Sequence, residues 1–207
     1  MKKVYTLFIA FSFTASCFSQ GLWSEKTNYP VGTNSSSITF SIGSLGYLYT
    51  GDSTSTNFFV YDPIANTWTA KAPFPGPARQ FATGFATDSL GFIGTGLVYG
   101  TTVVNSMYSY DPVANAWSAI ASYPDSVHNA SSFGIGSTGY IISGQVGYSY
   151  TTTTSCYSYN PYVNQWTQIT SIPRAMSSGS SRSAHAKGYC FNGSADSIYQ
   201  YNPVGNS

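Results

Sequence analysis

The sequence predicts an all-β protein built from four similar repeats, because separate markers recur in one register. A Tyr-Asp/Asn-Pro-x-x-Asn motif begins at positions 61, 110, 159 and 201, and in three of these copies a Trp follows the Asn by two residues. The tryptophans lie at positions 23, 68, 117 and 166, so neighbouring tryptophans are 45, 49 and 49 residues apart. Prolines at positions 30, 75, 124 and 173 keep the same step.

Each repeat is predicted to form four short strands. In the third repeat these are residues 131–135, 139–144, 156–159 and 165–169, which are rich in Tyr, Phe, Ile and Thr. Gly, Asn, Pro and Ser bound them, as is typical of strands joined by tight turns. The second strand of each repeat has the pattern Gly-aromatic-x-x-x-Gly, and its final glycines are Gly51, Gly96, Gly144 and Gly193.

The Tyr-Asp/Asn-Pro motif predicts a hairpin between the third and fourth strands. The Asp or Asn side chain can accept hydrogen bonds from the backbone just downstream, and the Asn before the Trp tolerates a left-handed backbone. The Tyr and the Trp then face each other across the hairpin, where large rings bury most area. The residues predicted to form this repeated structure are Trp23, Tyr61, Trp68, Tyr110, Trp117, Tyr159, Trp166 and Tyr201.

These motifs and their spacing resemble the kelch repeat, whose sheets form the blades of a β-propeller. The resemblance covers about all of the chain after the N-terminal segment and implies units at about 29–72, 73–121, 122–170 and 171–207. One departure is clear. Kelch units usually carry two adjacent glycines after the second strand, and here the first of the pair is replaced by Thr50, Thr95, Ser143 and Asn192.

Ring closure is predicted from two incomplete motifs. The last Tyr-Asn-Pro copy has no Trp, whereas residues 20–28 carry Trp23 with no three strands before it. Trp23 is therefore expected to lie on a closing strand. Two forms of the all-β propeller remain open: a four-bladed ring closed by Trp23, or a fragment of a six- or seven-bladed ring. The second form, a fragment of a larger ring, is favoured because the sequence stops inside a motif.

The N-terminus predicts export. Lys2 and Lys3 precede an apolar run over residues 4–15 that is too short to anchor in a membrane, and cleavage after Ser19 is expected. Lipidation at Cys17 is the alternative. A secreted, periplasmic or cell-surface location follows from either. With 8 Lys and Arg against 7 Asp and Glu, the chain lacks the basic excess of a nucleic-acid-binding protein, and no other segment predicts a transmembrane helix.

Candidate binding residues come from positions four residues after the repeat prolines. Asn34, Arg79, His128 and Ser177 occupy this position and are expected at the mouth of a central channel. A solvated rim without a ligand is the competing interpretation. The longest loops between second and third strands carry exposed aromatic candidates for recognition, namely Tyr99, Tyr148 and Tyr150.

No metal or cofactor is expected. The chain has 3 cysteines and 2 histidines with no metal-ligand spacing, and Cys156 and Cys190 are expected to be buried thiols rather than a disulfide. No residue is predicted to be catalytic. The first hypothesis is a non-catalytic scaffold that binds a protein or a carbohydrate. The alternative, which rests on the kelch resemblance, is an exported sugar-active enzyme similar to sialic-acid mutarotases or, less closely, to galactose oxidase.

Overall fold

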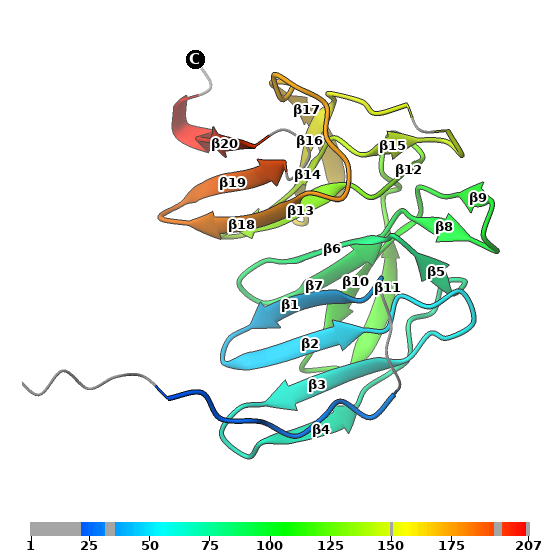
Figure 1. The fold of residues 1–207 in the computed structure, drawn as a ribbon, viewed down its shortest axis with the longest axis vertical. Helices are drawn as coiled ribbons and strands as arrows, with labels where there is room; N and C mark the ends of the chain where they lie inside the picture. Colours follow the sequence, from blue (N-terminus) through cyan, green and yellow to red (C-terminus); the bar gives the residue numbers. More distant parts are fainter. Residues whose placement is uncertain (1–21, 32–35, 150, 193–195, 206–207) are drawn as a thin grey trace, which may run out of the picture.

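The fold consists of short antiparallel sheets arranged around an arc (Figure 1). The structure, a computed structural model, describes residues 22–31, 36–149, 151–192 and 196–205. These residues form β-strands, one short 3-10 helix, η1 (Pro203–Gly205), and no α-helix. In the described part of the chain, no helix has the length and apolar character that a membrane crossing requires.

Four of the sheets are the expected blades. Blade one contains β1 (Ile38–Ile42), β2 (Leu45–Tyr49), β3 (Phe58–Asp62) and β4 (Thr67–Ala70). Blade two contains β6 (Thr83–Ala86), β7 (Gly91–Gly94), β10 (Met107–Asp111) and β11 (Ala116–Ile120). Blade three contains β13 (Ser131–Ile135), β14 (Thr138–Ile142), β16 (Cys156–Asn160) and β17 (Gln165–Ile169). Among the described residues, blade four has three strands, β18 (Ser180–Ala184), β19 (Lys187–Asn192) and β20 (Ser197–Tyr201).

Two smaller sheets extend from one end of the blades. The first joins β5 (Arg79–Gln80), β8 (Leu97–Val98) and β9 (Thr102–Val103), and the second joins β12 (Val127–His128) and β15 (Gln145–Val146). Both are built from the linkers between blades and from the long loops that follow β7 and β14. They lie beside each other on the right of Figure 1.

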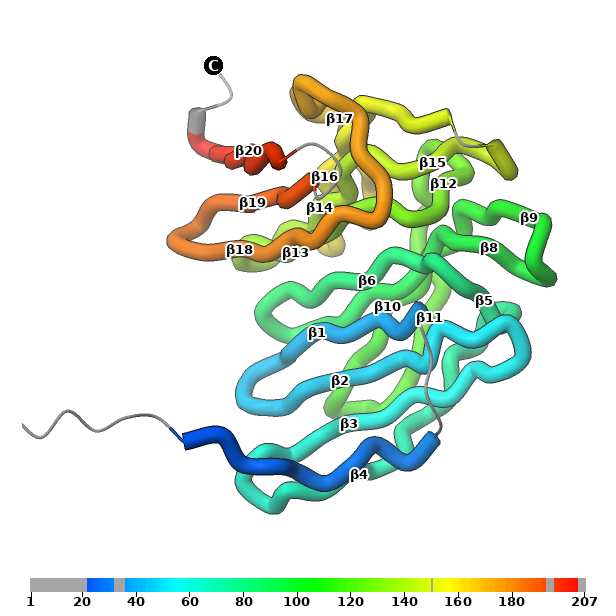
Figure 2. The backbone as a smooth tube through the Cα atoms, viewed as in Figure 1, coloured from blue at the N-terminus to red at the C-terminus, as the bar shows by residue number. Residues whose placement is uncertain are grey.

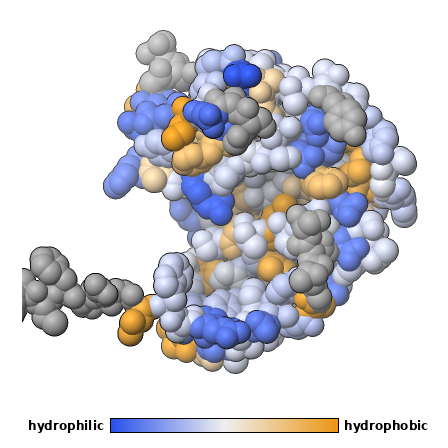
Figure 3. Space-filling view, in the orientation of Figure 1, coloured by the Kyte–Doolittle hydropathy of each residue, from blue (hydrophilic) through white to orange (hydrophobic). Residues whose placement is uncertain are grey.

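The blades follow one another radially, which is the arrangement of a β-propeller. The first strands of the blades, β1, β6, β13 and β18, lie next to one another along the inner face. The tube in Figure 2 shows that the path turns steadily from blade one to blade four. A wide notch separates blade four from blade one in Figure 3, so the arc is open on that side. The predicted all-β propeller class is confirmed.

Aromatic rings fill the space between neighbouring blades. Tyr110 of blade two packs edge-on against Phe58 of blade one at 4.8 Å between ring centroids, and Trp117 lies 5.0 Å from the same ring. Tyr159 of blade three contacts Phe92 of blade two at 5.6 Å. The Tyr and Trp of each motif also face each other across their hairpin, as the sequence predicts, with 4.8–4.9 Å between centroids.

In blades one to three, a single asparagine joins the blade to the linker before it. The Oδ1 atom of Asn115 accepts hydrogen bonds from the Tyr110 hydroxyl at 2.8 Å and from the backbone N–H of Ala72 at 3.1 Å. The Trp117 indole donates to the Ala72 carbonyl at 2.9 Å. Phe74 then packs edge-on against Trp117 at 5.4 Å. We call this set of contacts the interblade clamp.

The clamp recurs in the same form at blades one and three. At blade three, Asn164 accepts from Ala121 N–H at 2.7 Å, Trp166 donates to the Ala121 carbonyl at 2.9 Å, and Tyr123 packs on the indole. The clamp asparagines Asn66, Asn115 and Asn164 all have φ between 49° and 54°. This left-handed conformation, which Asn tolerates better than most residues, aims the side chain at the linker.

The N-terminal segment supplies the linker of the clamp on blade one. Thr27 donates its N–H to Asn66 Oδ1 at 3.0 Å and accepts from the Trp68 indole at 3.0 Å, while Tyr29 packs edge-on against Trp68. Residues 27 and 29 therefore act as Ala72 and Phe74 do at the next blade. Trp23, four residues before Thr27, is fully exposed.

Replacing Asn115 tests the clamp. Asn115→Ala removes the Oδ1 acceptor that the Tyr110 hydroxyl and the Ala72 N–H share. It also leaves at a positive φ an alanine, whose side chain makes no hydrogen bond. We expect it to lower the free energy of unfolding by about 2–4 kcal/mol in urea titrations. Asn115→Gly, which relieves the backbone cost, should lose about 1 kcal/mol less. Equal losses in the two variants would contradict the backbone part of this account.

Glycines at the start of the second strands allow the blades to approach closely. A Cβ on Gly139 would lie 2.0 Å from the Phe85 ring, whereas a Cβ on the equivalent Gly46, which faces the notch, would find its nearest neighbour at 4.0 Å.

We expect Gly139→Ala to destabilise the protein by about 3 kcal/mol and Gly46→Ala by less than about 0.5 kcal/mol, measured by thermal and urea unfolding. A large loss in Gly46→Ala would show that a further element covers blade one.

Candidate functional site

The inner face of the arc is a groove lined by small polar side chains and by aromatic rings. The first strands of the four blades form its wall, and a hollow of about 440 Å³ lies along them. Depressions of about 300 and 370 Å³ continue it toward the two ends of the strands. The Ser and Thr residues of the central hollow are Thr39, Ser41, Ser132, Ser181 and Ser183, and its aromatic residues are Phe40, Tyr47, Tyr61, Trp68, Phe85 and Phe133. We call this surface the channel wall.

Hydrogen bonds between blades hold the hydroxyls of this wall. Ser181 of blade four donates to the Ser132 carbonyl at 2.7 Å and accepts from the Ser132 N–H at 2.9 Å. Ser132 in turn donates to the Gly84 carbonyl of blade two at 2.8 Å. At Gly134, which faces the neighbouring first strand, the strands approach too closely for a larger residue, because a Cβ there would lie 1.8 Å from the Ala86 carbonyl oxygen. The polar wall is thus a consequence of packing.

Arg182 breaks the pattern of the wall. Its equivalents in blades one to three are Phe40, Phe85 and Phe133, whose rings lie over a second-strand glycine of the following blade. On blade four, the arginine is exposed and its Nη1 donates to the Ser181 carbonyl at 2.7 Å. Among the described residues that line the hollow, it is the one Lys or Arg side chain. The wall therefore combines neutral hydroxyls with one cation.

An acid and a histidine share the depression at one end of the wall. Asp88 follows β6 and His185 lies in the hairpin between β18 and β19, and both line the same hollow. The Asp88 N–H donates to the Gly136 carbonyl at 3.1 Å, which fixes the hairpin of blade two against that of blade three. His185 has φ of 50°, which places its backbone in the left-handed conformation of a tight hairpin turn. Sequence reasoning did not bring these two residues together, because they come from hairpins of different repeats.

Arg79 lies inside the protein rather than at the channel mouth. Its side chain is completely buried, with Nη1 donating to the carbonyls of Thr95 and Ser106 at 3.1 and 3.2 Å. The guanidinium carbon lies 4.8 Å from the centre of the Phe74 ring. Burial lowers the pKa of the guanidinium. These contacts give Arg79 a packing role between blades one and two.

Counting from the repeat prolines aligned Arg79 with His128, and this alignment was wrong by one residue. In the small sheets, His128 pairs with Gln145 while Gln80 pairs with Leu97, and these partners both directly follow the glycine after the second strand. Gln80 is therefore the equivalent of His128, and Arg79 corresponds to the buried Val127. The linker of blade two, Pro75-Gly76-Pro77-Ala78, contains one more residue than the corresponding linkers, which shifts the count from the proline.

The remaining candidates at the channel mouth differ in exposure. His128 is buried, and its Nδ1 lies 3.2 Å from the Gln145 carbonyl, while the Phe81 ring is 6.4 Å away. Ser177 is partly exposed. Asn34 lies outside the described residues. A ligand role for this set of positions stays a prediction, and Gln80 joins it on the basis of the pairing in the small sheets.

Two of the three candidate loop tyrosines are exposed as expected. Tyr99, in the turn between β8 and β9, is 80% exposed, and Tyr148, in the loop after β15, is 69% exposed. The two loops project from the end of the arc where the small sheets lie (Figure 1). Tyr150 lies outside the described residues. Their role in binding also stays a prediction.

The described residues contain no cluster of metal ligands. No group of three or more His, Cys, Asp or Glu side chains comes together among them. Cys156 and Cys190 are buried free thiols in neighbouring blades, and burial raises the pKa of both, that of Cys190 to about 12. The predicted signal peptide, residues 1–19, falls outside the described residues, as do Cys17 and Gly193.

Comparisons with known proteins identify the fold but no family. No family model and no curated protein matches the sequence. The solved structure titled "Structure of YjhT" superposes with a TM-score of 0.76 at 18% sequence identity. The match covers 88% of this chain and 64% of that one, so this chain spans about two thirds of the length of its structural neighbour. At this identity the likeness supports the β-propeller fold alone.

Removing one hydroxyl tests how the channel wall is held together. Ser181→Ala leaves the partly buried N–H and carbonyl of Ser132 without this partner. We expect a loss of about 1–3 kcal/mol in the free energy of unfolding, measured by urea titration. Ser183→Ala, on an exposed neighbour in the same strand, is the matched control and should change stability by less than about 0.5 kcal/mol. Equal effects would contradict a structural role for the Ser181–Ser132 bonds.

Proposed function

We propose that the protein is an exported kelch-type β-propeller that binds a carbohydrate along its channel wall. The observation that carries the proposal is the composition of that wall. Five Ser and Thr hydroxyls and the Arg182 guanidinium line one continuous hollow. Sugars are recognised by convergent hydrogen-bond donors and acceptors placed in a concave site, and a hydroxyl can serve as either.

The surroundings of the wall suit a binding scaffold. Rigid strands of four blades supply the lining residues, so the hydroxyls are held in place before a ligand arrives. The exposed Tyr99 and Tyr148 stand on loops at one end and offer flat rings for the less polar faces of a sugar. The kelch assignment itself rests on the repeated Tyr-Asp/Asn-Pro and Gly-aromatic-x-x-x-Gly motifs, and the export assignment rests on residues 1–19.

A second candidate, a sugar-active enzyme, is favoured by one observation. Asp88 and His185 line the same depression and could serve as a general acid and base across a sugar ring. Asp88→Asn and His185→Asn each remove one proton-transfer group, and Asn tolerates the positive φ of His185. Conversion of a reducing sugar by the native protein, lost by at least about 100-fold in both variants, would favour the enzyme over the scaffold.

Arg182 provides the direct test of carbohydrate binding. The native protein is screened on a glycan array, and the best ligand is then titrated by calorimetry. We expect Arg182→Ala to weaken binding about tenfold, the effect of one charge-assisted hydrogen bond. Arg174→Ala changes an exposed arginine outside the channel wall and should leave affinity unchanged. The proposal fails if no glycan binds, or if both variants bind as the native protein does.

A further inference from the structure

Three residues with a left-handed backbone are joined by hydrogen bonds at the small-sheet end of the channel wall. Phe81, Asn129 and Ser178 each lie two residues before the first strand of a blade, and their φ values are 52°, 54° and 54°. The Asn129 N–H donates to the Phe81 carbonyl at 3.0 Å, and the Ser178 N–H donates to the Asn129 carbonyl at 2.9 Å. The start of each of these blades is therefore tied to the start of the next.

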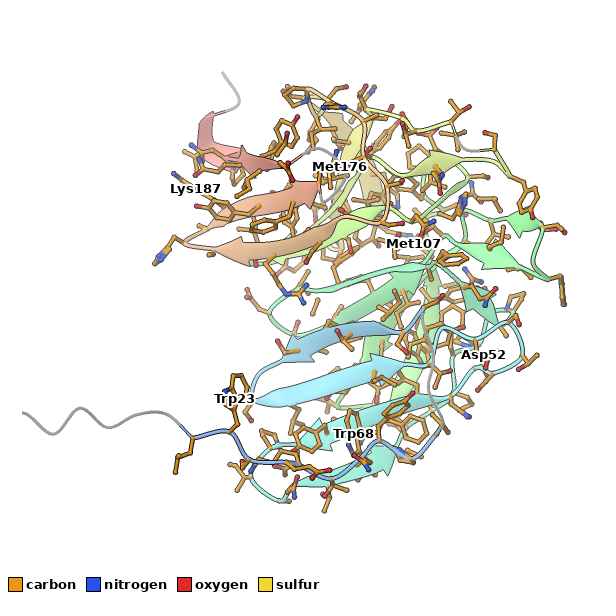
Figure 4. All side chains as sticks on the ribbon, viewed as in Figure 1. Trp23, Asp52, Trp68, Met107, Met176 and Lys187 are labelled. Carbon is orange, nitrogen blue, oxygen red and sulfur yellow. The ribbon has the colours of Figure 1, made fainter. Side chains whose placement is uncertain are left out.

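The linkers that lead into these three residues are also held in one way. The Gly96 N–H donates to the Val127 carbonyl at 2.9 Å, and the Gly144 N–H donates to the Met176 carbonyl at 3.0 Å. Val127 and Met176, the second of which is labelled in Figure 4, each precede the left-handed residue of their linker by two positions. The repeated contacts establish that the left-handed positions are equivalent between blades.

Phe81 is the residue at these positions that folding does not explain. Asn tolerates the left-handed region, whereas a bulky aromatic residue is strained there. The Phe81 side chain is 37% exposed, and in the described part of the chain it belongs to none of the three hydrophobic core clusters. Strained residues of this kind concentrate in binding sites, where the side chain rather than the backbone determines the choice of residue.

Polar side chains surround the Phe81 ring. The His128 ring lies 6.4 Å from it, and His128 Nδ1 donates to the Gln145 carbonyl at 3.2 Å, because a carbonyl oxygen can only accept. The Asn129 amide donates to the Gln145 side-chain oxygen at 3.0 Å. No hydrogen bond within the described part of the chain uses His128 Nε2, Asn129 Oδ1 or Gln145 Nε2, and none of these atoms is among its enclosed polar atoms. We call Phe81, His128, Asn129 and Gln145 the mouth cluster.

The mouth cluster adjoins the channel wall. Ala82 and Ala130, which directly follow Phe81 and Asn129, line the depression of about 300 Å³ at this end of the wall, and Arg182 lines it too. A ligand in the depression can therefore contact both the wall and the cluster. The cluster contains no Lys, Arg, Asp or Glu, so its unused donors and acceptors suit hydroxyl groups better than an ion.

We infer that the mouth cluster is a second subsite for the carbohydrate and binds an uncharged sugar unit. The less polar face of the sugar ring lies on Phe81, and the sugar hydroxyls bond to His128 Nε2 and to the unused amide atoms of Asn129 and Gln145. The inference rests on the proposed carbohydrate binding, and it adds the position and the neutral chemistry of one sugar unit. Phe81 is then a specificity residue whose backbone strain is retained for its ring.

Phe81→Asn separates a binding role from a structural one. Asn fits the left-handed backbone but removes the ring, so we expect the urea midpoint of unfolding to rise. We expect binding to weaken about tenfold, as for the loss of one aromatic contact. The probes are maltotetraose, cellotetraose and chitotetraose, titrated by calorimetry into the full chain. Phe81→Tyr keeps the ring and should retain the native affinity within about twofold.

Val113→Ala is the matched control. Val113 is 95% exposed, in the hairpin between β10 and β11 at the opposite end of blade two, so its loss should change neither the urea midpoint nor the affinity. Native affinity in Phe81→Asn, with binding weakened in Arg182→Ala, would overturn the subsite and leave the proposed function standing. A lower urea midpoint in Phe81→Asn would overturn it too, because the ring would then serve packing.

The choice of probes separates the remaining outcomes. If the native protein binds a charged glycan on the array but none of the three neutral tetrasaccharides, the subsite inference fails alone. If the native protein binds no glycan at all, the subsite inference and the proposed carbohydrate binding fail together.

Discussion

The structure depends on the interblade clamp, in which one asparagine serves two blades at once. The Oδ1 atom of Asn115 accepts from the Tyr110 hydroxyl of its own hairpin and from the Ala72 N–H of the preceding linker. Trp117 closes the set by donating to the Ala72 carbonyl. Because both polar groups of the linker residue and both rings of the hairpin are engaged together, the position of one blade determines that of the next. Repeating the same contacts produces the arc.

Close approach at the inner face sets the chemistry of the groove. Blades that radiate from an axis crowd their first strands, and a residue that faces the neighbouring first strand must be small, as the 1.8 Å approach of a Cβ on Gly134 to the Ala86 carbonyl oxygen illustrates. Serine meets this limit and supplies hydrogen bonds that the backbone needs, as Ser181 does for Ser132. The Ser hydroxyls of the wall, on which the proposed carbohydrate site rests, therefore arise from the requirements of folding, and Arg182 is the residue that adds charge to the wall.

Sequence predicted the local structure well because each hairpin encodes its own turn. The Asn before each Trp, the Tyr and Trp across the strands and the glycine after the second strand all appear where the motif places them. The clamp partners were not predicted, because Ala72 and Asn115 are 43 residues apart and alanine carries no signal of its role. Asp88 and His185 were missed for the same reason, since only the packing of separate blades brings their hairpins together.

The error at Arg79 has a specific physical origin. Counting from the prolines assumes linkers of equal length, and Pro77 lies in a linker that is one residue longer. The glycines after the second strand are the better reference for aligning the repeats. Gly96 has a positive φ, and the close approach of the linker leaves no room for a side chain there, because a Cβ would lie 2.7 Å from the Gln80 carbonyl oxygen. Counted from those glycines, Gln80 and His128 come into register.

Arg182 connects the channel wall with the open face of blade four. Its position belongs to the set that packs on the following blade, since Phe133 lies over Gly188 and Phe85 lies over Gly139. A neighbour placed against blade four would cover the aliphatic part of the arginine and leave its guanidinium facing the groove. That arrangement would fix the cation in the channel wall at less entropic cost than an exposed side chain allows. If such a neighbour orders this side chain, its packing and ligand binding would favour each other to the same extent, because coupling between two binding events is reciprocal.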